Sequence, residues 1–331
     1  MLHSIASLLD GFVSSLQTWL YIDLVQPLLF KFGWMDYDED TYDALYPVIV
    51  GLLTIVTMYV LLRPLEAWRP VERWTSRKGV RVDVFYTWLS KLGLFNLFFF
   101  VSFQPIFDKT QVWLRYHGIA NINLDTLWPG VTSQPLVAFA IYLIVLDFAG
   151  YWFHRWQHRF GLWWELHAVH HSQRQLSLWS DDRNHLLDDV LQAGFFAAIA
   201  IAIGVAPAQF VVLTAVTNFA QSVQHANARL PFGPLLERLI VSPSFHRRHH
   251  AVGYGHEGTA YGCNFGVLFP WWDMLFRTAS WNRTVEPTGI RQQFEGETYG
   301  DGFIAQHWLA FVRIARRLGL RRAGDGGASA A

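Results

Sequence analysis

Histidines are concentrated in one stretch of this chain, and they occur in groups with helical spacing. Ten of the 14 histidines fall between His154 and His250. Three groups read HRWQH at residues 154–158, HAVHH at 167–171 and HRRHH at 246–250. Positions i, i+3 and i+4 share one face of a helix, so each group presents its imidazoles in one direction. Such rows can close around a metal, and so many imidazoles are costly to bury without partners. The sequence therefore predicts a metal site.

The ligand type narrows the choice of metal. Imidazole suits Fe, Zn, Cu and Ni, whereas Mg and Ca prefer oxygen ligands. Cys263 is the one cysteine, which excludes a thiolate site or an iron–sulfur cluster. Eight to ten imidazoles exceed the three or four protein ligands of one zinc, so two metals are expected. HRWQH lacks the glutamate of the HExxH protease motif, and bis-histidine haem binding would leave most of the cluster without a role.

Composition points to a membrane. The chain has 331 residues, of which 52% are hydrophobic and only 16% are charged, against about 25% charged in a typical soluble domain. Lys and Arg number 26, as do Asp and Glu, so there is no basic excess that would indicate nucleic-acid binding. We therefore expect a membrane protein that does not bind nucleic acid.

Apolar stretches predict the course of the chain. Residues 44–62 carry no charge and are long enough to span a bilayer as a helix. Residues 63–81 carry six basic and two acidic side chains, which places this loop in the cytoplasm. Residues 82–107 then return across the membrane, and residues 135–153 cross inward to deliver His154. Residues 190–205 and 208–223 predict a shallow hairpin. Every predicted ligand thus lies on the cytoplasmic side.

These stretches predict an all-α, polytopic membrane helical bundle with a cytoplasmic histidine-rich cap. About four membrane-crossing helices or hairpin arms are expected, together with interfacial helices. We divide the chain into an N-terminal interfacial segment with an acidic loop (1–43), two transmembrane helices with their loops (44–130), a catalytic domain (131–280) and a C-terminal part (281–331). Within the last, residues 303–318 predict a basic amphipathic helix that lies on the membrane or packs on the cap, followed by a disordered tail.

Four polar residues are expected beside the ligands. Asp147 lies two helical turns before His154 and can accept a hydrogen bond from a ligand imidazole, although an ordinary helix-to-helix hydrogen bond fits its position equally well. Asn218 and Gln221 share a helical face with His225, at spacings i, i+3 and i+7. We expect Asn264, which follows the third histidine group, beside the ligands as well.

The three histidine groups, in this order and with membrane helices between them, resemble the boxes of the fatty acid hydroxylase/sterol desaturase superfamily of integral membrane di-iron oxygenases. The flanking segments RNH at 183–185, NFG at 264–266 and WDMLF at 272–276 are also similar. The resemblance covers roughly residues 130–280. It implies that two irons are held by histidines and that no further catalytic residue is needed. The implied ligands are His154, His158, His167, His170, His171, His185, His225, His246, His249 and His250. Some family members have a second histidine where this chain has Gln221, which leaves the ligand count at one iron open.

The same resemblance implies a reaction. It is the O₂-dependent hydroxylation or desaturation of a C–H bond in a lipid, which can be a sterol, fatty acyl chain, carotenoid or ether lipid. The chain has no cytochrome, flavin or iron–sulfur motif, so we expect a separate electron donor, of the ferredoxin or cytochrome b5 type with its reductase. Arg155, Arg159, Arg247 and Arg248 are the expected docking charges. The alternative is a membrane protein that stores or transports metal without redox chemistry, but transporters typically place their ligands at mid-membrane.

Overall fold

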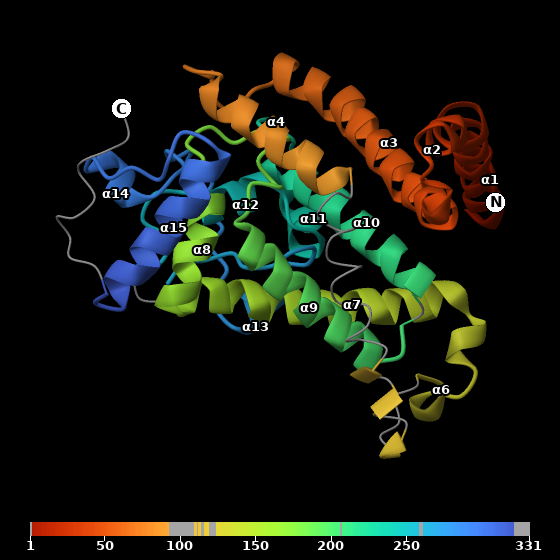
Figure 1. Ribbon diagram of the computed structural model, residues 1–331. Coiled ribbons are helices and arrows are strands. Elements are labelled where there is room, and N and C mark those ends of the chain that lie inside the picture. Colours follow the sequence, from red (N-terminus) through yellow and green to blue (C-terminus); the bar gives the residue numbers. More distant parts are fainter. Residues whose placement is uncertain are drawn as a thin grey trace.

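The chain folds into helices joined by irregular segments (Figure 1). The computed structural model describes residues 2–92, 124–205, 207–257 and 261–320, with short stretches between 109 and 118. Within these ranges there is no strand, and the one β-bridge joins Ala251 to Thr288. The prediction of an all-α fold is therefore confirmed for the described residues. The second half of the expected 82–107 helix and the expected disordered tail lie outside them.

Two helical segments are long and apolar enough to cross a membrane. They are Met35–Trp68, which contains α3 (Asp38–Trp68), and Pro135–Arg159, which is α7. One side of α3 exposes large apolar side chains, including Val56, Tyr59 and Val60, which is the pattern of a surface that faces lipid. The N-terminal helices α1 (Leu2–Leu20) and α2 (Gln26–Phe32), linked by the π-helical turn Tyr21–Val25, lie beside the start of α3 (Figure 1).

Helices also occupy the other segments that were expected to enter the membrane. The described part of α4 is Lys78–Lys91, α9 is Leu186–Ala202 and α10 is Pro207–His225. Helices α7, α9 and α10 pack together around Ala138, Tyr142 and Leu213. The contact between α3 and α4 requires Gly51, because a Cβ there would lie 1.7 Å from the carbonyl oxygen of Lys91. Helices α3, α4, α7, α9 and α10 form the scaffold that carries the histidine groups.

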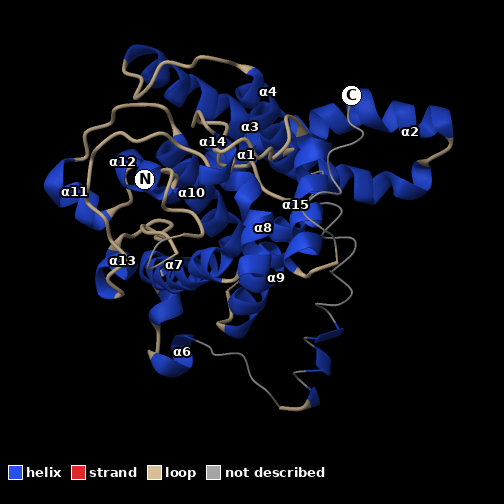
Figure 2. Cartoon of the chain, turned by 90° about the vertical axis from the view of Figure 1, so that its left-hand side faces the viewer, coloured by secondary structure: helices blue, strands red, loops and turns tan. Residues whose placement is uncertain are grey.

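Short helices lie at the end of the scaffold where α7 and α10 terminate (Figures 1 and 2). They are α8 (Gly161–His171), α11 (Gly233–Leu239), α12 (Pro243–His249), α13 (Trp271–Leu275), α14 (Arg291–Phe294) and α15 (Phe303–Arg317). On the far side of the scaffold, α6 (Leu124–Leu127) precedes α7. Helix α15 packs its Ala310 and Arg313 side against α8 while Trp308 stays exposed. This packing on the cap is one of the two arrangements expected for the amphipathic helix.

Candidate metal centre

Four helices end at the same place, and their last turns carry the histidines. α7 stops at Arg159 because Phe160 is extended (φ −93°, ψ 115°), and α8 begins at the next residue and ends at His171. α10 ends at His225. α12 begins at the Ser242 cap, whose side chain accepts from the Phe245 N–H, and ends at His249. The carbonyl ends of helices carry partial negative charge, so four converging C-termini favour a cation between them.

The imidazoles form two clusters, in each of which the candidate ligand atoms lie within 4.8 Å of one another. The five-histidine cluster consists of His154, His158, His167, His171 and His249. The four-histidine cluster consists of His170, His225, His246 and His250. Each i, i+4 pair stays in one cluster, and the remaining histidine of the second and third groups joins the other cluster. Helical geometry brings the i, i+4 pairs together, whereas the packing of the helix ends determines which cluster the third histidine joins.

In the four-histidine cluster, the close contacts between Nε2 atoms cannot all be hydrogen bonds. Those of His225, His246 and His250 form a triangle with sides of 3.1, 3.1 and 3.2 Å, and His170 Nε2 lies 3.3 Å from that of His225. A neutral imidazole nitrogen either donates or accepts, so at least one side of any triangle joins two like atoms. Tetrahedral nitrogens about 2.1 Å from a metal lie about 3.4 Å apart, so this set fits one cation.

The five-histidine cluster also contains ring nitrogens that a shared metal would satisfy. The Nε2 atoms of His158, His167, His171 and His249 are buried, and none has a hydrogen-bond partner among the described residues. Buried polar atoms normally have a partner, and four that lie in one cluster match the donor set of a transition metal. The residues present therefore fit a metal at each cluster.

In the five-histidine cluster, hydrogen bonds on the opposite ring nitrogens orient the Nε2 atoms toward the cluster centre. Three Nδ1–H groups donate to main-chain carbonyls of one segment, residues 255–265: His154 to Phe265 (3.0 Å), His158 to Gly255 (2.9 Å) and His249 to Cys263 (2.8 Å). His167 Nδ1 donates to the Asp188 carboxylate at 3.2 Å. Such bonds fix the tautomer that leaves Nε2 free to ligate a metal.

Burial keeps the ligands neutral. The pKa values of His170, His171, His246, His249 and His250 are all lowered well below the usual histidine value, first by loss of solvent and then by neighbouring imidazoles. A neutral imidazole is the form that binds a metal. At neutral pH both clusters are therefore ready to accept cations.

Comparison with known proteins identifies this arrangement. The family model for fatty acid hydroxylase matches residues 139–278, the segment that contains all nine clustered histidines. Over these residues the chain is similar to the fatty acid hydroxylase family.

Curated proteins similar to this chain differ in how much of their length it matches. It is 26% identical to ornithine lipid hydroxylase OlsE of Rhizobium tropici over 82% of this chain and 76% of that protein. It is 26% identical to alkylglycerol monooxygenase of Homo sapiens over 50% of this chain, but only 34% of that protein. Very-long-chain aldehyde decarbonylase GL1-7 of Oryza sativa subsp. japonica is 26% identical over 53% of this chain and 28% of its own length. No solved structure matches.

His185, the tenth ligand implied by the resemblance, lies outside both clusters. Its Nδ1 accepts from the Leu187 N–H at 3.1 Å and so caps the start of α9. Its ring packs on His307 of α15, with centroids 4.4 Å apart, and the Leu186 N–H donates to His307 Nε2. Burial lowers the pKa of His185 to about 4. The structure therefore gives this histidine a helix-capping role, and its assignment as a ligand stays a prediction.

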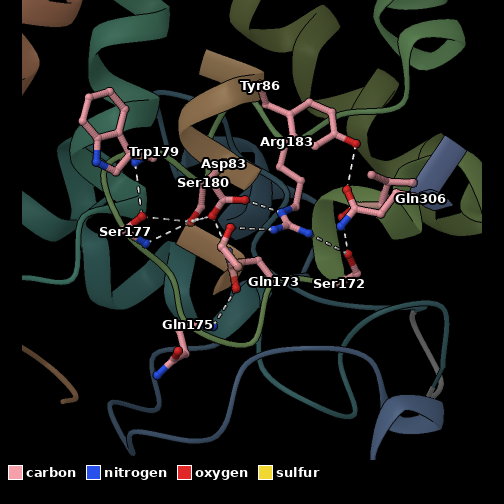
Figure 3. Close-up of polar contacts among 12 residues, drawn as sticks. Asp83, Tyr86, Ser172, Gln173, Gln175, Ser177, Trp179, Ser180, Arg183 and Gln306 are labelled. Atoms are coloured by element: carbon pink, nitrogen blue, oxygen red, sulfur yellow. Dashed lines mark hydrogen bonds and ion pairs between the residues drawn. The ribbon is translucent and has the colours of Figure 1, made fainter. Parts of the chain in front are cut away.

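The neighbouring Arg183 anchors the segment that connects the second histidine group to α9 (Figure 3). Its guanidinium forms an ion pair with Asp83 of α4, which is fully buried. Asp83 also accepts from the Gln173 amide and the Ser180 hydroxyl, and the second Arg183 nitrogen donates to the Gly79 carbonyl. These contacts fix the end of α8, and with it His170 and His171, against α4.

Two polar residues expected beside the ligands instead hold the segment that follows the third group. Asp147 accepts from the main-chain N–H groups of Leu268 and Phe269 and from the Trp272 indole. Asn264 has a left-handed backbone (φ 58°), and its amide bonds the main chain of Phe245 and Ser280. Neither side chain bonds a histidine in these contacts, so both act by shaping the carbonyl-bearing loop.

Asn218 and Gln221, the other two polar residues expected beside the ligands, accept hydrogen bonds with their main-chain carbonyls. The His225 Nδ1–H donates to the Gln221 carbonyl at 2.8 Å, and the Ser222 hydroxyl donates to that of Asn218. Asp181 lies 3.6 Å from His225 Nδ1. Sequence reasoning missed Asp181, Asp188 and the carbonyls of residues 255–265. The only sequence signal for Asp188 is a pair of aspartates at the start of an otherwise apolar helix.

Proposed function

We propose that this chain is a membrane-bound lipid hydroxylase that holds two irons, one in each histidine cluster. The observation that carries the proposal is the convergence of buried Nε2 atoms on two centres without hydrogen-bond partners that could satisfy them. The relatives whose names describe lipid hydroxylation or monooxygenation support a lipid substrate and O₂ as co-substrate.

The ligand set fits the chemistry proposed. Irons held at these clusters would supply the activation of O₂ and the oxidation of a C–H bond. The imidazoles carry no negative charge, so the protein leaves the cations less neutralised than carboxylates would. The carbonyls of Gly255, Cys263 and Phe265, together with Asp188, hold the rings in place. The burial of the clusters excludes bulk water from the reacting atoms.

We propose that the clusters lie at the cytoplasmic end of the membrane helices. Both candidate spans end near them, because α7 carries the first histidine group and the segment after α3 contacts the end of α10. Val71 and Glu72 donate their N–H groups to the Asn227 side chain, two residues beyond His225. The basic loop at residues 63–81 is therefore beside the ligands, which supports the cytoplasmic assignment. Four membrane crossings remain our proposal for the whole chain.

Electrons must come from a separate donor in this proposal, and the structure narrows where it can dock. Arg247 and Arg248 are each only 7% exposed and form ion pairs with Glu72 and Glu286, so they do not belong to a surface patch. Arg159 is exposed and covers Tyr261, and Arg155 is half-buried over Trp152. These two arginines remain in the proposed docking surface.

Metal analysis of three variants tests the proposal. We expect about two irons per chain in protein purified in mild detergent, with Mössbauer spectra of a coupled pair after growth with iron-57. His158→Ala and His250→Ala each remove a ligand from a different cluster, and each should lower the iron content. His185→Ala is the matched control and should keep both irons, because His185 lies outside the clusters. One zinc per chain, or iron loss in the His185 variant equal to that in the others, would contradict the proposal.

A further inference from the structure

A cavity of about 390 Å³ lies against the four-histidine cluster and has no role in the chemistry described above. Its walls come from the ends of α3 and α10, from α11 and α12, and from residues 283–286. His225 is part of the wall. Figure 2 shows α10, α11 and α12 grouped at one edge of the molecule. A ligand in this cavity would therefore lie next to a proposed metal ligand.

Three buried side chains in the cavity wall have unused hydrogen-bonding atoms. The Nε–H groups of Arg247 and Arg248 and the Oε1 of Gln224 are buried, and none has a hydrogen-bond partner in the described part of the chain. All three side chains are more than nine-tenths buried. Unpaired buried donors are rare in folded proteins. Two buried guanidinium groups in the wall of one cavity favour a carboxylate or a phosphate as its ligand.

The mouth of the cavity has an excess of positive charge. Five arginines line it, and three of them are paired with glutamates: Arg247 with Glu72, Arg248 with Glu286, and Arg283 with Glu237. Arg69 and Arg229 are exposed and have no carboxylate within ion-pair distance among the described residues. The Arg229 guanidinium is held in place by the carbonyls of Pro70 and Val71, both at 3.0 Å. Two positive charges without a carboxylate partner thus remain for an anion, and that of Arg229 is fixed in position.

The rest of the wall is apolar, which indicates an amphiphile rather than a free anion. Leu176, Ala226, Leu230, Phe232 and Val285 contribute to it. The volume lies near the lower end of the roughly 300–1,000 Å³ of small-molecule sites. That is room for a charged headgroup and the first carbons of its chains, and not for a whole two-chain lipid.

We propose that this cavity binds the anionic headgroup of the lipid substrate, through a phosphate or carboxylate on the arginines. The inference rests on the proposed function, because it takes the bound lipid to be the molecule that is oxidised. The apolar wall holds the first carbons of the lipid, and His225 lies in the same cavity. The carbon that is oxidised is therefore close to the headgroup, and not at the far end of an acyl chain.

Binding of short-chain lipids to the purified full-length protein tests this assignment. The probes are dioctanoyl phosphatidate, dioctanoylglycerol, which has the same chains without the charge, and inorganic phosphate, measured by calorimetry in neutral detergent. We expect phosphatidate to bind at least about tenfold more tightly than either other probe, and high salt to weaken it. Arg69→Gln should weaken phosphatidate binding several-fold, and Arg69→Gln with Arg229→Gln more strongly. Neither variant should change binding of dioctanoylglycerol.

Arg73→Gln is the matched control, because Arg73 is an exposed arginine of the same loop that lines a neighbouring notch and not this cavity. Equal binding of phosphatidate and dioctanoylglycerol, or unchanged phosphatidate binding in the double variant, would overturn the inference. Phosphate that binds as tightly as phosphatidate would show a site for a free anion and overturn the lipid assignment. Measurements on iron-free and iron-loaded protein separate this result from the proposed function, which stands or falls on the metal content.

Discussion

Substitution of Asp188 should weaken metal binding at the five-histidine cluster and leave metal binding at the four-histidine cluster unchanged. Its carboxylate accepts hydrogen bonds from Gln157 Nε2 at 2.8 Å, Trp163 Nε1 at 2.7 Å and His167 Nδ1 at 3.2 Å. It is 2% exposed, so solvent does not replace these bonds. Through His167 it orients a ligand of the five-histidine cluster, and none of these bonds reaches the four-histidine cluster. We therefore predict a cluster-specific effect for Asp188→Asn.

The magnitude follows from what asparagine keeps and loses. One amide oxygen can replace one carboxylate oxygen, but the amide N–H₂ then faces a donor, so at least one of the three hydrogen bonds is lost. The negative charge next to the ligand imidazole is lost as well. Substitution of such a partner typically lowers metal affinity by about 10–100-fold, which corresponds to about 1.4–2.8 kcal/mol. We expect a loss in this range at the five-histidine cluster.

Anaerobic titration of iron-free protein with Fe²⁺ against a competing chelator measures both affinities. In the wild-type protein two binding phases are expected, and in the Asp188→Asn variant one of them should weaken while the other stays unchanged. Asp189→Asn is the matched control, since it removes the neighbouring carboxylate, for which the structure gives no bond to a histidine. Equal weakening of both phases, or equal effects of the two substitutions, would refute the reasoning.

Three further predictions concern the stability of the folded protein in detergent, which is measured by thermal unfolding. Burial lowers the pKa of the last two histidines of α8 and of all three in the third group. Below about pH 6.5 the unfolded chain therefore binds protons that the folded chain does not. Iron-free protein should lose at most about 1.4 kcal/mol per histidine per pH unit as the pH falls, and a flat profile between about pH 8 and pH 5 would contradict this. Arg183→Ala leaves the buried carboxylate of Asp83 unpaired and should destabilise the fold by about 3–5 kcal/mol. A loss of unfolding free energy below about 1 kcal/mol would show that the ion pair does not anchor the loop. Gly51→Ala forces α3 away from Lys91 and should cost about 1–3 kcal/mol, whereas Gly194→Ala, which meets no atom within 4 Å, should not destabilise.

Local spacing was sufficient for the features that depend on one helix at a time. The i, i+4 periodicity predicted that His154 pairs with His158, and similar pairs occur in the second and third groups. The length of the apolar stretches at residues 44–62 and 135–153 predicted the two long apolar helices, which the structure shows as α3 and α7. These predictions succeed because 3.6 residues per turn determines which side chains share a face, whatever the helix packs against.

The tertiary structure alone decided how the histidines divide and what holds them. Whether His170 joins His167 or His225 depends on how α8, α10 and α12 meet, and no spacing within a box contains that information. The carbonyls that orient His154 and His158 come from residues 111 and 97 positions away, and the one that orients His249 from a residue 14 positions away. Any residue type can supply a carbonyl, so these partners leave no trace in the sequence. His185 shows the converse, since it has the right chemistry and a family-like neighbourhood but lies at a helix cap. Side-chain identity determined that this chain can bind metals, and the packing of helix ends determined where.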